Sequence, residues 1–200
     1  SDWHLVHYGS RATGGVGLII TEMTAISETG RITEGCAGIY NAEQLNQWKK
    51  ITEFIHNNTS TKIGIQLGHS GRKGATKKPW EGNGPMETPW NLISASPIPF
   101  NENFSTPKEM TLEDMEQIKA QFVQAAKNAD EAGFDMIELQ AHHGFLLASF
   151  LSPLTNIRTD EYGGSIENRL KYPLAIFKAI RDVFPSEKPI KNNVCNIIKK

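Results

Sequence analysis

One stretch of the sequence decides the fold: TLEDMEQIKAQFVQAAKNADEAGFDMIELQ, residues 111–140. Thr111 and Asp114 form a capping box, which predicts a helix that begins after Thr111. Apolar residues at helical spacing follow, and Gly133 ends the helix. Residues 134–140 then form a short apolar run that predicts a buried strand. A helix that leads directly into a buried strand is one unit of a parallel α/β fold.

The sequence on either side repeats this alternation. We expect helices over residues 2–12, from Asn41 through Ile55 and from Ser165 through Ile180, and strands over residues 16–21, 62–67 and from Lys188 onward. The positions expected to face the core in the last helix are Leu170, Leu174, Phe177 and Ile180. Residues 68–107 hold six of the ten prolines and predict a long functional loop. The order predicts a parallel sheet with right-handed crossovers.

Both a doubly wound sheet and a (β/α)8 barrel satisfy this order. The barrel is favoured because polar residues gather where the strands end: Thr21-Glu22, Gln66 and Gln140 to His143. A full barrel needs eight strands and about 250 residues. The 200 residues supply three clear strands and the start of a fourth. The sequence therefore predicts an α/β fold with roughly half of a TIM-type barrel.

Composition excludes several classes of protein. The 21 basic residues nearly balance 22 acidic ones, which argues against a nucleic-acid partner. The longest apolar runs are far too short to span a membrane. Cys36 and Cys195 are too few for a disulfide framework or a four-cysteine metal site, and they fit a reducing compartment such as the cytoplasm.

Gln66 lies near the end of its strand, before the glycine-flanked segment 68–74. Its amide offers a donor and an acceptor in one plane, which suits an imide or carboxamide edge of a ligand. Taken alone, a glutamine bonded to neighbouring backbone is the simpler interpretation. Arg72 and Lys73 in the same segment could bind an anion, although a solvated basic turn explains them more simply.

A second polar cluster, Gln140-Ala-His-His-Gly144, follows the third strand. Side chains alternate along a strand, so His142 and His143 are expected to diverge, which disfavours them as joint metal ligands. Gln140 and His143 would converge if the chain turns there. Two neutral donors on one carbonyl oxygen would then stabilise an enolate-like charge. A pair of packed, hydrogen-bonded histidines is an equally good interpretation.

Two further side chains have open roles. Glu22 is either a base or a structural acceptor, and His69 is expected to bond its own loop. A metal-dependent barrel hydrolase that uses His69, His142 or His143 with Glu138 is a further hypothesis. The absence of ligand spacing disfavours it, and no metal site is predicted.

Taken together, these segments resemble the old yellow enzyme family of FMN-dependent ene reductases, also described as NADH:flavin oxidoreductases. The resemblance is carried by His7-Tyr-Gly-Ser-Arg11, Gly17-Leu-Ile-Ile-Thr-Glu22, Gly64-Ile-Gln-Leu-Gly-His-Ser-Gly-Arg-Lys73, His143-Gly144, Phe150-Leu-Ser-Pro-Leu-Thr-Asn156, Arg158-Thr-Asp-Glu-Tyr-Gly-Gly-Ser165 and Glu167-Asn-Arg169. Residues 71–76, 80–82 and 94–99 are similar to a subgroup of reductase domains that act on aromatic CoA thioesters.

The resemblance implies a β/α barrel with FMN at its carboxyl-terminal face. It implies hydride transfer from NADH or NADPH, through the flavin, to an activated alkene, that is, an α,β-unsaturated carbonyl compound or thioester. By position, Gln66 would hold the pyrimidine edge of the flavin, and the backbone of Met23 would touch the flavin. Gln140 and His143 fall on the two catalytic donor positions that bind the substrate carbonyl.

Two residues depart from the family pattern. The family usually has His at the position of Gln140, although Gln can still donate a hydrogen bond. Many members carry a tyrosine proton donor at the position of Phe145, and Phe has no proton to give. Water or another acid would have to replace it, and losing a general acid costs on the order of 10²–10⁴ in rate.

The resemblance also implies a frame that is truncated at both ends. We expect residues 1–190 to form a partial FMN-binding domain and residues 191–200 to be an atypical Asn/Lys-rich tail, from a frameshift, a premature stop or a misplaced gene end. Residues 194–198 could form an edge strand. Open barrel edges predict poor solubility or self-association. A non-catalytic remnant that binds no flavin is the alternative function.

Overall fold

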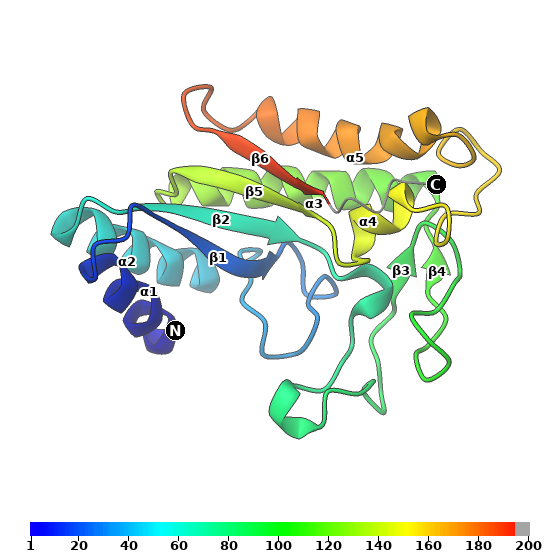
Figure 1. Ribbon diagram of the computed structural model, residues 1–200, viewed down its shortest axis with the longest axis horizontal. Helices are drawn as coiled ribbons and strands as arrows, with labels where there is room; N and C mark the ends of the chain where they lie inside the picture. The colour runs from blue at the N-terminus through cyan, green and yellow to red at the C-terminus, as the bar shows by residue number, and fades with distance from the viewer. Residues whose placement is uncertain (195–200) are drawn as a thin grey trace.

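The computed structural model describes residues 1–194, and its centre is a parallel sheet with the strand order β1-β2-β5-β6 (Figure 1). The four strands are β1 Leu18–Ala25, β2 Lys62–Gly68, β5 Met136–Ala141 and β6 Ile190–Val194. Two short parallel strands, β3 Ile93–Ser94 and β4 Lys108–Glu109, pair with each other in a second sheet. Four parallel strands joined by helices are half of the set that closes a (β/α)8 barrel, as expected.

The helices are α1 Asp2–Thr13, α2 Ala42–Asn58, α3 Leu112–Glu131, α4 Leu146–Leu151 and α5 Ile166–Arg181, with 3₁₀ turns at Gly71–Lys73 (η1) and Pro79–Glu81 (η2). Three predicted caps are confirmed, because the side chains of Asn41, Thr111 and Ser165 each accept a bond from a first-turn backbone N–H. Among the described residues, no helix combines the length and apolar character that crossing a membrane requires.

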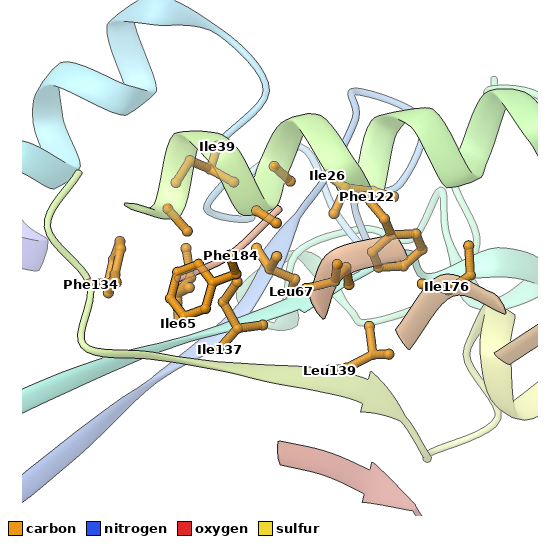
Figure 2. Packing of buried hydrophobic residues seen from close by; sticks show 14 of the residues in the cluster. Ile26, Ile39, Ile65, Leu67, Phe122, Phe134, Ile137, Leu139, Ile176 and Phe184 are labelled. Carbon is orange, nitrogen blue, oxygen red and sulfur yellow. The ribbon is translucent and has the colours of Figure 1, made fainter. Parts of the chain in front are cut away.

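The core lies on one face of the sheet, against α2, α3 and α5 (Figure 1). Alternate residues of β2 and β5 point into it, including Ile65, Leu67, Ile137 and Leu139 (Figure 2). Phe122 of α3 packs among them and is fully buried. Because strand side chains alternate, residues between these positions face away from the helices, onto the open face of the sheet.

The predicted bounds of β1 were wrong. It runs from Leu18 to Ala25 instead of residues 16–21, with a bulge between Ile20 and Met23. Its far end pairs with a downstream loop, where the N–H of Ala25 donates to the Ala37 carbonyl at 2.9 Å. A non-local partner of this kind leaves no periodic signal in the strand itself. Met23 therefore lies inside the strand.

The inward face of α5 also differs from the prediction at one position. Leu174 is 53% exposed, whereas Tyr172 and Ile176 are buried in the core. Residues two positions from both lie on the far side of a helix, so docking through Tyr172 and Ile176 turns Leu174 outward. Helix α4, which was not predicted, is a single short segment in the apolar run after β5.

Strand β6 crosses the boundary that was expected at residue 190. Lys191 pairs in register with Glu138, and Val194 pairs with Ala141. The division into a domain and a tail stays a prediction. Residues 195–200, with Cys195 and most of the suggested edge strand, lie outside the described residues.

Candidate active site at the carboxyl end of the sheet

The strand register brings the candidate residues into rows on the open face of the sheet. Met23 of β1 pairs with Gln66 of β2, and Gln66 pairs with Glu138 of β5. Gln140 lies two residues beyond Glu138 on the same face and pairs with Asn193 of β6. Since the strands are parallel, all of these positions approach the edge where the carboxyl ends meet.

Two predicted residues, Gln66 and Gln140, meet through their side-chain amides. Gln140 Nε2 donates to Gln66 Oε1 at 3.0 Å, and Gln66 Nε2 donates to Glu138 Oε1 at 2.6 Å. The backbone N–H of His142 donates to Gln140 Oε1 at 3.3 Å. We call this chain of bonds from Glu138 to His142 the amide relay. The simpler expectation for Gln66, a bond from its side chain to neighbouring backbone, was wrong.

Glu138 is the buried charge of the site, with 3% of its surface exposed. Lys191 Nζ lies 2.9 Å from its Oε2, and Asn193 Nδ2 donates to its Oε1 at 3.0 Å. Burial raises the pKa of the carboxyl group, but the bonds from Lys191, Gln66 and Asn193 outweigh burial and hold the pKa below its usual value. Glu138 is therefore an ionised acceptor.

Sequence reasoning named Glu138 only as a candidate metal ligand and missed its role beside Gln66. The available signal was its spacing, because a residue two positions before Gln140 in a strand shares its face. Among residues 1–194, no three His, Cys, Asp or Glu side chains gather as a metal site would require. The metal hydrolase hypothesis has no support in the described part of the chain.

The two histidines after β5 do not diverge, and that prediction was wrong. Their ring centroids lie 3.8 Å apart at 79°, edge to face. The strand ends at Ala141, and His143 has the left-handed φ of 59°, so the alternation of a strand no longer applies. The chain thus turns where β5 ends, which is the condition stated for bringing His143 toward Gln140. His142 is buried, and burial and the neighbouring ring of His143 lower its pKa.

Lys73 and Arg72 anchor the loop that follows β2, and neither is a simple solvated turn residue. Lys73 Nζ donates to the His143 carbonyl at 2.9 Å and lies 5.3 Å from the ring centroid of Phe145. Arg72 Nη1 donates to the carbonyls of Ile98 and Pro99. Lys73 thus clamps the His143 turn from the opposite loop.

Glu22 and His69 have structural roles. Glu22 Oε1 lies 2.9 Å from His4 Nε2 and accepts from the Tyr8 hydroxyl at 3.5 Å, which ties β1 to α1. His69 Nδ1 accepts from the backbone N–H of Gly71 at 3.0 Å, which confirms that it bonds its own loop. Burial lowers the pKa of His69 to about 4, so its ring is neutral near pH 7.

The residues on the open face fit FMN. After its relay bonds, the Gln66 amide keeps one N–H and one acceptor lone pair, a donor set that suits the imide edge of a flavin. Gly68 allows Met23 and Gln140 to approach the backbone of β2 closely. A Cβ at this position would come within 2.6 Å of Met23 Sδ and 3.0 Å of Gln140 Cβ. That Gln66 and Met23 hold the cofactor stays a prediction.

Known proteins resemble this chain in sequence and in fold. A model of the NADH:flavin oxidoreductase / NADH oxidase family matches residues 1–194. An NADPH dehydrogenase of Clostridium acetobutylicum is 44% identical over 190 residues, which are 95% of this chain and 52% of that protein. The crystal structure of old yellow enzyme from Pichia sp. AKU4542 has a TM-score of 0.84 and 32% identity, over 97% of this chain and 50% of its own.

A structure of morphinone reductase in complex with tetrahydroNAD has a TM-score of 0.81 and 32% identity, over 95% of this chain and 53% of its own. The chain spans about half the length of the curated relatives it matches. These findings confirm the resemblance to old yellow enzymes and the partial barrel, and the family match supports FMN as the cofactor. The family match, the parallel sheet and the amides at its carboxyl end agree, and the chain belongs to the NADH:flavin oxidoreductase / NADH oxidase family.

Proposed function

We propose that the protein is an FMN-dependent oxidoreductase that passes hydride from NADH or NADPH to an activated alkene, an α,β-unsaturated carbonyl compound or thioester. The observation that carries the proposal is the pairing of Gln66 and Gln140 across β2 and β5, where each amide keeps one N–H outside the relay. One amide then serves the cofactor and the other the substrate, side by side.

Each residue has a definite role in this proposal. When bound, FMN supplies the hydride-transfer chemistry that links a reduced nicotinamide to the alkene. Gln66 fixes the pyrimidine edge of the cofactor, and Met23 lines the cofactor through its backbone. Gln140 and His143 donate to the substrate carbonyl oxygen and stabilise the negative charge that develops there. Phe145 supplies no proton, so water or another acid must protonate the α-carbon.

An FMN titration of the purified chain tests the proposal. We expect saturable binding with a shifted visible spectrum, and affinity at least about tenfold lower in Gln66→Leu, which loses the hydrogen bonds to the imide edge. Gln117→Leu, an exposed glutamine of α3, is the matched control and should bind normally. If the chain binds no FMN while a version completed with the second half of a relative does, the chain is a non-catalytic remnant.

The partners we propose are small molecules and, for this chain alone, a second copy. Leu18, the first residue of the edge strand β1, is 49% exposed, and Val194 on β6 is 44% exposed. Unpaired strand edges with apolar side chains favour association. A monomer in sedimentation velocity at all concentrations, with a sharp two-state melt, would contradict self-association. The aromatic CoA-thioester subgroup and a cytoplasmic location stay part of the proposal.

A further inference from the structure

We propose that Glu138 is the positioning residue of the site, because it sets which way round the amides of both Gln66 and Gln140 lie. The nitrogen and oxygen ends of an amide have the same size but opposite hydrogen-bonding character. A flipped Gln140 would turn its oxygen, instead of an N–H, toward a substrate carbonyl. The orientation of each amide therefore decides whether it attracts or repels its ligand.

The first end of the amide relay is an acceptor only. An ionised carboxylate has no proton to donate, so the Gln66 atom that faces Glu138 must be Nε2. Their separation of 2.6 Å is short for a bond from an N–H, and a charged acceptor shortens such bonds. Gln66 Oε1 therefore faces Gln140. The Gln140 atom that contacts this acceptor must be the donor Nε2.

The second end of the relay is a donor only. The backbone N–H of His142 can only donate, so the Gln140 atom that faces it must be Oε1. Glu138 and the backbone of His142 therefore require the same orientation of the two amides. Flipping either amide would place two donors or two acceptors against each other and lose bonds on both sides. One arrangement of the two glutamines satisfies all three bonds.

Strand β6 keeps Glu138 in the state that the relay needs. Lys191 Nζ lies 2.9 Å from Oε2, and Asn193 Nδ2 donates to Oε1 at 3.0 Å. Both come from alternate positions of β6, next to Glu138 and Gln140 in register. Lys191 and Asn193 therefore stabilise the ionised form of Glu138, and the charge of Glu138 orients the amide of Gln66.

The consequence for ligands rests on the proposed function. With this orientation, Gln140 keeps one N–H for a substrate carbonyl, and Gln66 keeps one N–H and one lone pair for the flavin imide. Unlike an imidazolium, which donates from both nitrogens, the amide of Gln140 needs an external group to set its direction. Glu138 is the described residue that does so.

Amide NMR of the cofactor-free chain tests the orientation without relying on activity. With ¹⁵N-labelled glutamine, we expect one downfield Gln66 amide proton. We also expect the Gln66 and Gln140 signals to shift together when acid protonates Glu138, at a pH below the usual pKa of a glutamate. In Glu138→Gln, whose side chain can donate or accept, the downfield proton and the joint shift should both vanish. Glu138→Asp keeps the carboxylate and should retain both in part. Glu131→Gln removes an exposed carboxylate bonded to Lys49 and should change neither signal.

Unchanged glutamine signals in Glu138→Gln would overturn the proposal. Should that variant not fold, the acid titration of the native chain decides instead, and Gln66 and Gln140 signals that do not respond to Glu138 would equally overturn it. FMN titration then tests the consequence, with affinity expected to fall about tenfold in Glu138→Gln and to recover in part in Glu138→Asp. If the native chain shows the expected amide signals but binds no FMN, the proposed function fails and the orienting role of Glu138 stands.

Discussion

The two faces of the sheet are built from alternate residues of the same strands, yet they differ in chemistry. The covered face carries Ile65, Leu67, Ile137 and Leu139, which are buried against the helices. The open face carries Gln66, Glu138 and Gln140, joined by hydrogen bonds and backed by an ion pair with β6. The period of two along a strand lets one segment carry core residues on one side and the polar residues of the candidate site on the other.

Substitutions on the two faces should therefore affect different properties. A change on the covered face removes apolar contacts and should lower the free energy of unfolding. A change on the open face disturbs polar bonds and close approaches around the site, with smaller effects on stability.

Phe122→Ala should give the largest loss. Phe122 is fully buried among the α3 residues that cover β2 and β5, and truncating a core Phe costs about 3–5 kcal/mol. Urea unfolding measures the loss. Leu112→Ala, an exposed position at the start of the same helix, is the control and should cost less than about 1 kcal/mol. Equal losses for the two variants would break the contrast between covered and uncovered positions.

Acid should act through His69, at the end of β2. The pKa of His69 falls from 6.5 unfolded to about 4 folded, so between these values the unfolded chain binds a proton that the folded chain does not. Its stabilising contribution is complete above pH 6.5 and is lost as pH falls toward 4, by up to about 3 kcal/mol. Urea unfolding between pH 7 and 4.5 measures the slope.

His69→Gln should flatten that slope. The physical reason is that Nδ1 of His69 accepts from Gly71, and protonating that atom breaks the bond inside a buried site. An unchanged slope in His69→Gln would show that other groups carry the acid sensitivity.

Gly68→Ala should have an intermediate effect on the open face. The added Cβ would lie 2.6 Å from Met23 Sδ and 3.0 Å from Gln140 Cβ, and overpacking costs about 1–3 kcal/mol. The flexible Met23 side chain can move, so we expect the lower part of that range together with weaker FMN binding. Gly84→Ala, where no atom lies within 4 Å of the new Cβ, should leave both measurements unchanged.

Thr111→Ala should have the smallest effect of the four. It removes the side-chain oxygen that accepts from the Asp114 N–H at the start of α3, and losing such a cap costs about 1 kcal/mol. Thermal or urea unfolding detects it. Thr106→Ala, at an exposed threonine just before β4, should stay within about 0.5 kcal/mol of the parent chain. A larger loss at residue 106 than at 111 would contradict the predicted cap.

Much of the fold followed from local rules. The caps at Asn41, Thr111 and Ser165, strand β2 and the long loop after it were all predicted, because caps, periodicity and turn residues act over a few positions. The end of β1 escaped prediction because a distant segment, residues 37–39, pairs with it. The exposure of Leu174 was not predicted, because the burial of Tyr172 and Ile176 decides which side of α5 packs against the core.

The candidate site divides in the same way. By itself, the sequence determined which strands carry Gln66 and Gln140 and that their carboxyl ends share one edge, since residue spacing and parallel order suffice for that. Only the tertiary structure decided that the two amides bond each other, that Glu138 stands at the head of the relay and that the rings of His142 and His143 touch. Those contacts depend on the register between strands and on a left-handed turn, and neither is encoded in the spacing of residues along the chain.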